Sequence, residues 1–506
     1  MAADSVTSPT TAPSNALLRV HPEDDVAVAL APIPQGAEVA LDGLRLAAAS
    51  DIPRGHKIAL RAIAAGAPVR KYGFPIGRAS AEIAAGDHVH SHNLATALSG
   101  VEDYAYTPAP SAPVAAPKAT FQGYVRASGR VGTRNEIWIL CTVGCVTRTS
   151  QRLAAKANAK FAGRVDGVHA FTHPHGCSQL GDDLGKTRKI IAGLAGHPNA
   201  GGVLLVGLGC ESNQLNKLIA EIPDLDRSRM RAFAAQTTED EMETGMAAIE
   251  ELVALAEQDQ REERPLSDLV IGLKCGGSDG LSGLTANPLV GAVADRVAAA
   301  GGIPILTEIP EAFGAERLLM ARAKDRRVFD ETVAVVNDFK RYFIDHGQPV
   351  YENPSPGNKD GGITTLEEKS LGAVQKGGHA PLTDVLRYGE QAHEPGLALL
   401  EAPGNDAVSS TALVAAGATV LLFTTGRGTP LGFPAPTLKI ATNSALALKK
   451  PHWIDYNAGA MVEGKSFDQA ADELFKLVID TASGAEARNE QNDEREIAIW
   501  KDGVTL

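Results

Sequence analysis

One short phrase occurs four times near the start of the chain and limits the fold of that region more than any other feature. In each copy, glycine follows an isoleucine by three residues and a β-branched residue follows by six, at Ile33–Val39, Ile52–Ile58, Ile63–Val69 and Ile83–Val89. Glycine allows the positive φ of a tight turn, and β-branched residues favour the strand after it. The phrase therefore predicts a small all-β module, placed at residues 16–100, after a disordered N-terminus at residues 1–15.

A proline-rich segment separates this module from the rest of the chain. Residues 107–118 contain four prolines, which favour extended polyproline geometry, so residues 101–119 are predicted to be a semi-rigid linker. Beyond it, short apolar runs alternate with longer amphipathic stretches, as is typical of α/β architecture. The predicted strands are Ile137–Leu140, Val203–Val206, Leu269–Leu273, Ile303–Leu306, Leu397–Leu400 and Val420–Phe423.

The predicted helices include Glu239–Glu257, which opens with acidic residues as the helix dipole prefers, and Pro288–Ala300. A charged break at Gln258–Arg264 indicates a boundary between two units. The sequence therefore predicts a multidomain protein in which the β module precedes two Rossmann-like α/β units, residues 120–264 and 265–506.

Composition excludes several classes of partner. A net charge of -13 and a pI near 5.5 argue against nucleic acid, which needs a dominant basic face. No apolar run approaches the ~20 residues that cross a bilayer, and the start lacks the order of a signal peptide, so no membrane partner and a cytoplasmic location are expected. Five cysteines are too few for a disulfide framework, which favours reduced thiols.

Four of the five cysteines lie directly after a predicted strand or at a turn that follows one. Ligand-binding sites of α/β sheets form at such positions. Glycines beside the cysteines let the backbone approach a ligand closely, so we expect Cys177, Cys210 and Cys275 to converge on one metal, with Cys145 as a further candidate. The alternative is that each thiol is a small buried apolar group.

Histidines form a second group of candidates. His88, His90 and His92 alternate along the sequence, and the period of two in a strand would place all three on one face, as metal ligands or substrate contacts. The alternative is local hydrogen bonding near a domain surface. His173 stands close to Cys177 and is a candidate base or ligand.

An anionic substrate needs a local cationic pocket in so acidic a chain. Arg427, held between two glycines after a strand, is the strongest candidate for binding a carboxylate in bidentate fashion. Further candidates for binding the substrate are Lys359, Arg134, Lys274, Ser278, Ser282, Asn287 and Asn93; the candidate catalytic carboxylates are Asp279, Glu211 and Glu308. No P-loop or dinucleotide fingerprint is present, which disfavours ATP and NAD.

Several longer segments resemble the altronate/galactarate dehydratase family. The resemblance runs from about Leu18 to the C-terminus and includes H-P-H-G-C-S-Q-L-G-D-D at 173–183, C-G-G-S-D-G-L-S-G-L-T-A-N-P at 275–288, N-P-S-P-G-N-K-D-G-G at 353–362 and T-T-G-R-G-T-P at 424–430. The N-terminal module is similar to the SAF (β-clip) domain of that family. The run H-V-H-S-H-N at 88–93 is more similar to the altronate branch than to the galactarate branch.

The resemblance implies a sugar-acid dehydratase of hexuronate catabolism that converts D-altronate to 2-dehydro-3-deoxy-D-gluconate and water. It also implies dependence on Fe²⁺, with Mn²⁺ as an alternative. The residues leave open whether the iron is mononuclear or part of an iron–sulfur cluster held by three thiolates. On this hypothesis Arg427 and Lys359 bind the substrate carboxylate, His173 is a base or a metal ligand, and Asp279 transfers a proton or orients a hydroxyl group.

Other functions remain open from sequence. A galactarate dehydratase or a sulfolactate lyase of the same family is the nearest alternative, and a non-catalytic sugar-acid binding protein is the alternative from another class. The histidines at 88–92 reach the active site only if the module folds back over it, or if they serve a partner subunit in a homodimer.

Overall fold

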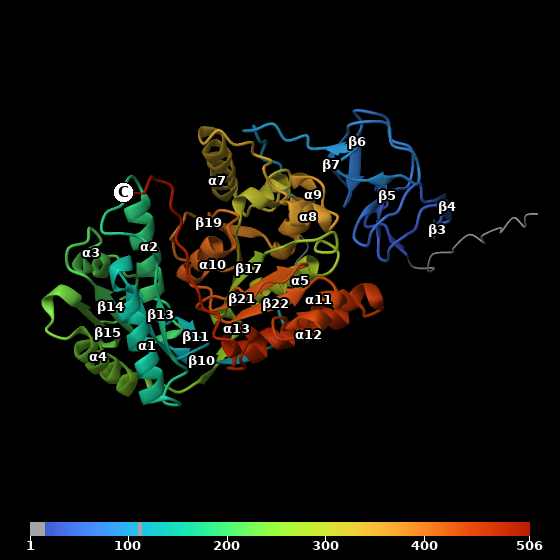
Figure 1. Cartoon of the computed structure of the whole chain (residues 1–506). Coiled ribbons are helices and arrows are strands. Elements are labelled where there is room, and N and C mark those ends of the chain that lie inside the picture. The colour runs from blue at the N-terminus through green and yellow to red at the C-terminus, as the bar shows by residue number, and fades with distance from the viewer. Residues whose placement is uncertain (1–15, 110–113, 506) are drawn as a thin grey trace, which may run out of the picture.

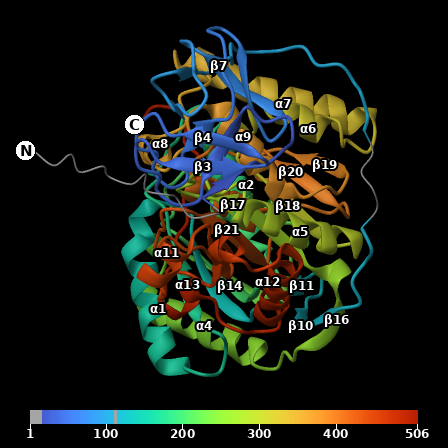
Figure 2. The same cartoon turned by 90° about the vertical axis from the view of Figure 1, so that its right-hand side faces the viewer.

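The computed structural model describes residues 16–109 and 114–505, and the predicted disordered segment at residues 1–15 lies outside the described residues. Figures 1 and 2 show a small β module packed beside α8 (Pro356–Asp360) and α9 (Leu366–Ala373) of a larger α/β body. In the described part of the linker, Ala109 N donates to Ala321 O at 2.8 Å, so this part lies against the body. No helix of the described residues is long and apolar enough to cross a membrane.

The all-β module is confirmed. Each repeated glycine (Gly36, Gly55, Gly66 and Gly86) has φ between 75° and 93°, as the turns require. The isoleucines of the copies pair two by two, Ile33 with Ile52 and Ile63 with Ile83. The strands form three small sheets: β1 (Leu17–Leu18), β2 (Val26–Ala29), β5 (Lys57–Ala59) and β8 (His88–Val89); β3 (Glu38–Leu41) and β4 (Leu44–Ala47); and β6 (Pro68–Lys71), β7 (Phe74–Ala79) and β9 (Leu94–Ala95).

The second unit is a four-stranded parallel sheet in the order β13-β12-β14-β15, with a small three-stranded sheet beside it. Its strands are β12 (Glu136–Cys141), β13 (Val168–Phe171), β14 (Ala200–Gly207) and β15 (Met230–Ala234), and the small sheet contains β10 (Thr120–Val125), β11 (Val131–Gly132) and β16 (Glu262–Pro265). Its helices are α1 (Thr147–Phe161), α2 (Asp183–Ala195), α3 (Leu215–Ala220) and α4 (Glu241–Ala256), with 3-10 turns η1 (Gly144–Val146), η2 (Arg227–Arg229) and η3 (Ala235–Thr237). The charged break at Gln258–Arg264 thus lies between the units, and its end forms part of β16.

The C-terminal unit is a seven-stranded parallel sheet in the order β19-β20-β18-β17-β21-β22-β23. Its strands are β17 (Val270–Cys275), β18 (Ile303–Leu306), β19 (Leu382–Leu386), β20 (Leu397–Leu400), β21 (Val420–Thr425), β22 (Thr437–Ala441) and β23 (Tyr456–Asn457). Its remaining helices are α5 (Ala286–Ala299), α6 (Glu316–Met320), α7 (Arg326–Asp345), α10 (Asp406–Ala415), α11 (Ser444–Lys449), α12 (Phe467–Ala482) and α13 (Arg488–Gln491), with 3-10 turns η4 (Leu266–Asp268), η5 (Ile309–Ala312), η6 (Val374–Gly377) and η7 (Ala458–Glu463). All six predicted strands and both predicted helices are present, with ends shifted by at most three residues.

Helices cover both faces of this sheet. Along β21 the side chains alternate between two apolar cores: Val420 and Leu422 face α5, whereas Leu421 and Phe423 face α10. A strand buried on both faces appears in the sequence as a continuous apolar run, which explains why β17 and β21 were predictable. The closer description of the α/β units as Rossmann-like stays a prediction.

The strand order of the C-terminal sheet identifies where a ligand would bind. Strands that follow β17 are added first on one side, as β18, β20 and β19, and then on the other, as β21, β22 and β23. In open parallel sheets, ligands bind outside the carboxyl ends of the strands where the order reverses. That point lies between the ends of β17 and β21.

Candidate active site

Two glycine-containing loops meet at the carboxyl ends of β17 and β21. The first continues from Cys275 to Asp279, and the second contains Gly426 and Arg427. A side chain on Gly426 would collide with the Asp279 carboxyl group, and one on Gly277 would contact Arg427 Cβ at 3.1 Å. The glycines therefore bring a carboxylate and a guanidinium-bearing residue together at this edge of the sheet.

Asp279 is firmly positioned in this loop. Its carboxylate accepts hydrogen bonds from Thr442 Oγ1 at 2.9 Å, Ser282 Oγ at 3.1 Å and Asn443 Nδ2 at 3.1 Å. Burial raises the pKa of Asp279, and the hydrogen bonds only partly offset that effect. A fixed carboxylate with a raised pKa is suited to accepting and returning a proton.

The β module meets the C-terminal unit beside Asp279. Gly55 of the module packs against Gly280 and Gly361, and Gly280 N donates to Gly361 O at 2.7 Å. Two buried ammonium groups, those of Lys57 and Lys71, each bind the buried Glu368 carboxylate at 2.8 Å. The module therefore folds back onto the body of its own chain, and we call this contact region the junction.

Four imidazoles gather at the junction. The rings of His56, His88 and His90 have centroids 5.0–5.4 Å apart, and the His92 ring lies 5.6 Å from that of His88. His56 Nε2 contacts Asp360 O at 3.2 Å, and His90 Nε2 contacts Lys359 O at 2.9 Å. The histidines predicted at 88–92 thus reach the C-terminal unit, and His56 joins them.

The hydrogen bonds fix the tautomers of these rings. A carbonyl oxygen only accepts, so His56 carries its proton on Nε2, and its Nδ1 accepts from His88 Nε2 at 3.0 Å. His88 Nδ1 therefore keeps a lone pair, and it has no hydrogen-bond partner among the described residues. Burial and the neighbouring imidazoles, that of His56 first, lower the pKa of His88 to about 4, which keeps this nitrogen unprotonated at neutral pH.

The close approach of His88, His90 and His92 has a cause other than the predicted strand face. Only His88 and Val89 lie in a strand, β8, and the following residues form a turn. Asn93 holds that turn, because its Oδ1 accepts from His90 N at 2.9 Å and its Nδ2 donates to His88 O at 3.0 Å. Asn93 therefore has a structural role in this turn, and its role in substrate binding stays a prediction.

The predicted cationic residues divide into two pairs. Arg427 is exposed and Lys359 is half-buried, and neither side chain makes a hydrogen bond or ion pair with any described residue. Arg134 is instead buried against Glu490 at 2.7 Å and donates to backbone carbonyls, and Lys274 is buried against Glu308 and Asp406. The donors of Arg134 and Lys274 are thus already engaged within the chain, and their assignment to substrate binding stays a prediction.

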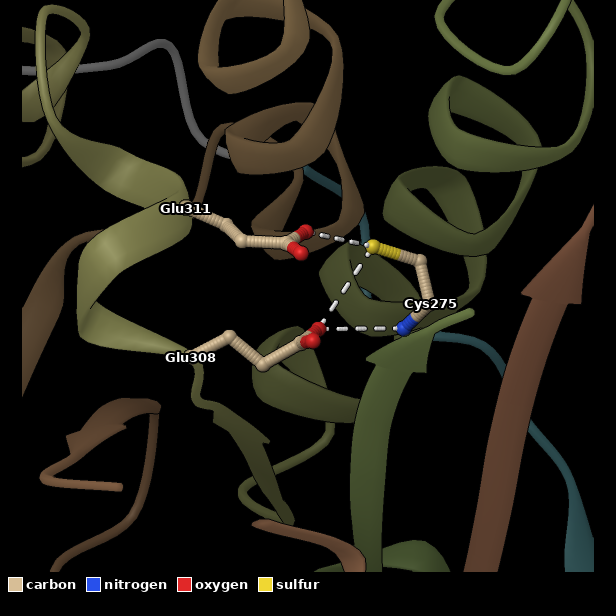
Figure 3. Close-up of side chains that lie close together, drawn as sticks. All are labelled: Cys275, Glu308 and Glu311. Carbon is tan, nitrogen blue, oxygen red and sulfur yellow. Dashed lines mark hydrogen bonds between the residues drawn. The ribbon is translucent and has the colours of Figure 1, made fainter. Parts of the chain in front are cut away.

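Cys275 lies in a charged cluster beneath the sheet edge. Figure 3 shows its thiol facing the Glu311 and Glu308 carboxylates, at 3.2 and 3.5 Å. Lys376 Nζ approaches the sulfur at 2.8 Å, and Lys369 Nζ binds Glu311 at 2.7 Å. With Lys274 and Asp406 these residues form what we call the buried network.

The buried network does not suit a metal cation. Three ammonium groups, on Lys274, Lys369 and Lys376, already balance three carboxylates, so a divalent ion would add uncompensated charge. Burial and the two glutamates raise the pKa of Cys275 to about 12, which keeps it a thiol. Cys275, Glu308 and Glu311 nevertheless each offer a donor atom within 4.8 Å of the others, so the assignments of Cys275 as a metal ligand and of Glu308 as a catalytic group stay predictions.

The other predicted thiols meet in the second unit. Gly144 N donates to His175 O at 2.8 Å and Ser212 N donates to Cys177 O at 2.7 Å, so the loops that carry Cys145, Cys177 and Cys210 lie against one another. Burial and the neighbouring thiols raise the pKa of Cys177. The three cysteines follow β12, β13 and β14, at the carboxyl edge of the second sheet. Cys177 and Cys210 therefore converge as predicted, but the third thiol is Cys145, because Cys275 belongs to the other sheet.

Two further residues of the second unit are structural. His173 is buried, with Nε2 against Cys141 O at 3.1 Å and Nδ1 accepting from His175 N at 3.2 Å. Glu211 accepts hydrogen bonds from Thr142 Oγ1 and from the N–H groups of Leu208 and Gly209. The polar atoms of both side chains are thus engaged within the unit, and their catalytic roles stay predictions.

The remaining predicted polar residues surround Asp279. Ser282 binds its carboxylate directly, Ser278 O accepts from Asn358 Nδ2 at 2.8 Å, and Asn287 is occupied by Thr424 Oγ1 at 2.7 Å and by Gly372 O. These residues shape the loop after β17. Sequence reasoning missed Thr442, Asn443 and His56; His56 directly follows the glycine of one repeat, which was the available signal.

One sizeable cavity lies away from this chemistry. It has a volume of about 580 Å³, lies between α2 and α7, is lined by Lys186, Lys189 and Trp500, and includes no predicted site residue. Lys186 stacks on Trp500 and pairs with Asp502, whereas the exposed Lys189 has no ion-pair partner among the described residues. A small cavity of about 10 Å³, lined in part by Asp279 and Ser282, has room for about one water molecule.

Unpaired cations beside a fixed carboxylate and neutral imidazoles define an enzyme that acts on a small anionic substrate. Family models of the D-galactarate/altronate dehydratases match three parts of the chain, their SAF domain at residues 15–97, their second domain at 123–257 and their C-terminal domain at 266–505. The chain belongs to the altronate/galactarate dehydratase family.

Three relatives align over nearly the whole chain. Altronate dehydratase of Escherichia coli is 51% identical and that of Bacillus subtilis is 49% identical, each over 97% of this chain and 99% of the relative. Galactarate dehydratase (L-threo-forming) of Escherichia coli is 33% identical over 93% of this chain and 94% of the relative.

Proposed function

We propose that this chain is a cytoplasmic hydro-lyase that converts D-altronate to 2-dehydro-3-deoxy-D-gluconate and water in hexuronate catabolism. The higher identity to the two altronate dehydratases than to galactarate dehydratase supports the choice of substrate. The observation that carries the proposal is the pair of unpaired cations, Arg427 and Lys359, near Asp279 at the point where the strand order reverses.

The proposed reaction begins with binding of the substrate carboxylate by Arg427 and Lys359. Removing the proton from C2, next to that carboxylate, adds a second negative charge, which these cations stabilise. Asp279 takes the C2 proton, the C2–C3 double bond forms and the C3–O bond breaks. Asp279 returns the proton to the departing oxygen, which leaves as water, and the enol product rearranges to the 2-keto acid.

Ferrous iron, with Mn²⁺ as an alternative, is the proposed cofactor. The imidazoles of the junction fit such an ion, because His88 keeps an unused, unprotonated Nδ1 and imidazole is a suitable ligand for iron. His88 and the exposed His92 would hold it. When bound, the ion supplies a Lewis acid near the substrate carboxylate and hydroxyl groups.

An anaerobic assay tests the substrate. The purified chain, supplied with Fe²⁺, is incubated with altronate, galactarate and sulfolactate, and formation of a keto-deoxy acid is followed. We expect kcat/KM to be highest for altronate. Turnover of galactarate or sulfolactate, with no product from altronate, would select the other branch of the family.

An isosteric variant separates catalysis from binding. Asp279→Asn keeps the hydrogen-bonded shape but removes the proton acceptor, so we expect kcat to fall at least 10²-fold while altronate still binds by calorimetry. Asp468→Asn, at an exposed position on α12, is the matched control and should retain wild-type kcat. If the unaltered chain bound altronate but gave no product with Fe²⁺ or Mn²⁺, the protein would be a sugar-acid binder.

A further inference from the structure

The three thiols of the second unit form a site that the proposed reaction does not use. They come from three separate loops, each after a parallel strand, and a glycine precedes every one: Gly144, Gly176 and Gly209. Cys145 and Cys210 are exposed and Cys177 is partly exposed, so the sulfur atoms are accessible from solvent. Cys141, by contrast, is buried, and its thiol donates a hydrogen bond to Ser150 Oγ at 3.2 Å, as is expected of a structural cysteine.

Sulfur is the main ligand type at this site. His173 and Glu211 are fully engaged in hydrogen bonds within their own loops, whereas His175, two residues before Cys177, keeps an Nε2 without a hydrogen-bond partner among the described residues. Soft thiolates suit iron–sulfur clusters, zinc and Cu(I) better than a hard ion. Three cysteines are one fewer than the four that usually hold a cubane cluster.

The surroundings favour the negative charge of such a cluster. Cys145 lies in η1, two residues before α1, whose first turn has no side-chain cap, so its backbone N–H groups and the positive end of its dipole face this region. Gln236 Nε2 donates to Cys210 Sγ at 3.6 Å, a contact that stabilises a thiolate.

We propose that Cys145, Cys177 and Cys210 hold a [4Fe–4S] cluster through three thiolates, leaving the fourth iron without a cysteine ligand. The three thiols release three protons on binding. The core carries a charge of 2+, with two ferrous and two ferric ions, and the three thiolates bring the site to a net charge of 1−. This inference is independent of the proposed function, because it concerns a resident cofactor that is measurable without turnover.

Cofactor analysis of the whole chain tests the proposal. The protein is purified anaerobically, or reconstituted with equal ferrous and ferric iron and sulfide, and iron, acid-labile sulfide and visible absorption are measured. We expect about four sulfides per chain. Mild oxidation should release the iron that lacks a cysteine and give the electron paramagnetic resonance signal of a [3Fe–4S] cluster.

Single variants locate the site. Cys145→Ser, Cys177→Ser and Cys210→Ser should each lose most of the sulfide and visible absorption, whereas Cys141→Ser, the matched control in the same unit, should retain both. Circular dichroism of each variant checks that it is folded. Sulfide retained in folded Cys177→Ser, a single metal ion without sulfide, or a disulfide among the three cysteines would each overturn the proposal.

The same measurements separate this proposal from the proposed function. His88→Ala should lose dehydration of altronate while keeping the sulfide content of the unaltered chain. A chain with four sulfides and no activity on altronate would reject the function and keep the cluster. A chain that is active on altronate but contains no sulfide would reject the cluster and keep the function.

Discussion

The junction and the buried network lie at the carboxyl edge of the same sheet, but they use charge differently. In the buried network every ammonium group has a carboxylate or thiol partner, and the lysine and glutamate side chains are almost inaccessible to solvent. At the junction Arg427 and Lys359 have no partner among the described residues, and the imidazole of His88 keeps a free lone pair. Paired buried charges fix a structure, whereas unpaired accessible charges are available to a ligand.

The largest expected effect tests the structural role of the buried network. Lys274→Met leaves Glu308 buried without its main partner, so we expect the free energy of unfolding to fall by roughly 3–5 kcal/mol in urea denaturation. Lys274→Met/Glu308→Gln removes both charges and should recover part of that loss. A Lys274→Met variant with unchanged stability but no turnover would place the buried network in the chemistry and break the comparison.

The next effect concerns the unpaired guanidinium of the junction. Arg427→Ala should lower kcat/KM for altronate by about 10²–10³-fold, because the developing charge loses a donor. The melting temperature should stay unchanged, since the side chain has no partner among the described residues. Arg427→Lys keeps the charge without the bidentate geometry and should recover only part of the activity. A large fall in melting temperature would show that Arg427 is structural.

A smaller effect concerns the pH dependence of stability. It contrasts a buried imidazole, with both ring nitrogens hydrogen-bonded, with the imidazoles of the junction. His197 is buried between Ala418 O and the N–H group of Asn199, and burial lowers its pKa to about 3. Below pH 6.5 the unfolded chain binds a proton that the folded chain does not, so stability falls as the pH is lowered. The contribution lost between pH 7 and pH 5 is about 2 kcal/mol.

Denaturation at pH 7 and pH 5 measures this loss. His197→Gln should show a smaller decrease than the unaltered chain, whereas His92→Gln, an exposed position, should show the same decrease as the unaltered chain. An equal loss in His197→Gln and the unaltered chain would mean that His197 is not the titrating group.

The smallest effect tests how the junction is shaped. Asn93→Ala removes two hydrogen bonds that hold the histidine turn, so we expect unfolding to become easier by about 1 kcal/mol. The more telling measurement is the affinity for iron, which should fall with little change in the KM for altronate. Unchanged iron affinity would show that the imidazoles do not depend on this turn, or do not hold the iron.

Local pattern predicted much of the fold. Glycine at four equivalent positions and continuous apolar runs such as Val420–Phe423 report conformations that neighbouring residues determine. The short, half-buried strands β13 and β19 were not predicted from the sequence, because their burial depends on which elements pack over them. The linker at residues 101–119 and the boundary near Gln258–Arg264 stay predictions, made because charged and proline-rich segments disfavour a buried core.

The candidate site was only partly predictable. Arg427 and Asp279 stand out in sequence because glycines flank them after strands, and the structure brings their loops together. Cys275 and Lys274 lie at the end of β17 and stand out in the same way, but their side chains are turned into the buried network. Sequence spacing locates the end of a strand, but it does not say whether a side chain there faces solvent or a buried counterion.

The sequence by itself determined the class of each segment, the family resemblance and the residue types available for the chemistry. The tertiary structure decided which of them act together: it placed Cys145 rather than Cys275 beside Cys177, added His56 to the histidines of the module, and left Arg427 unpaired while pairing Arg134. The physical reason is that turns and apolar runs are set by neighbours in the chain. Charge pairing and metal ligation depend on contacts between residues far apart in sequence, which only the packing of the three units creates.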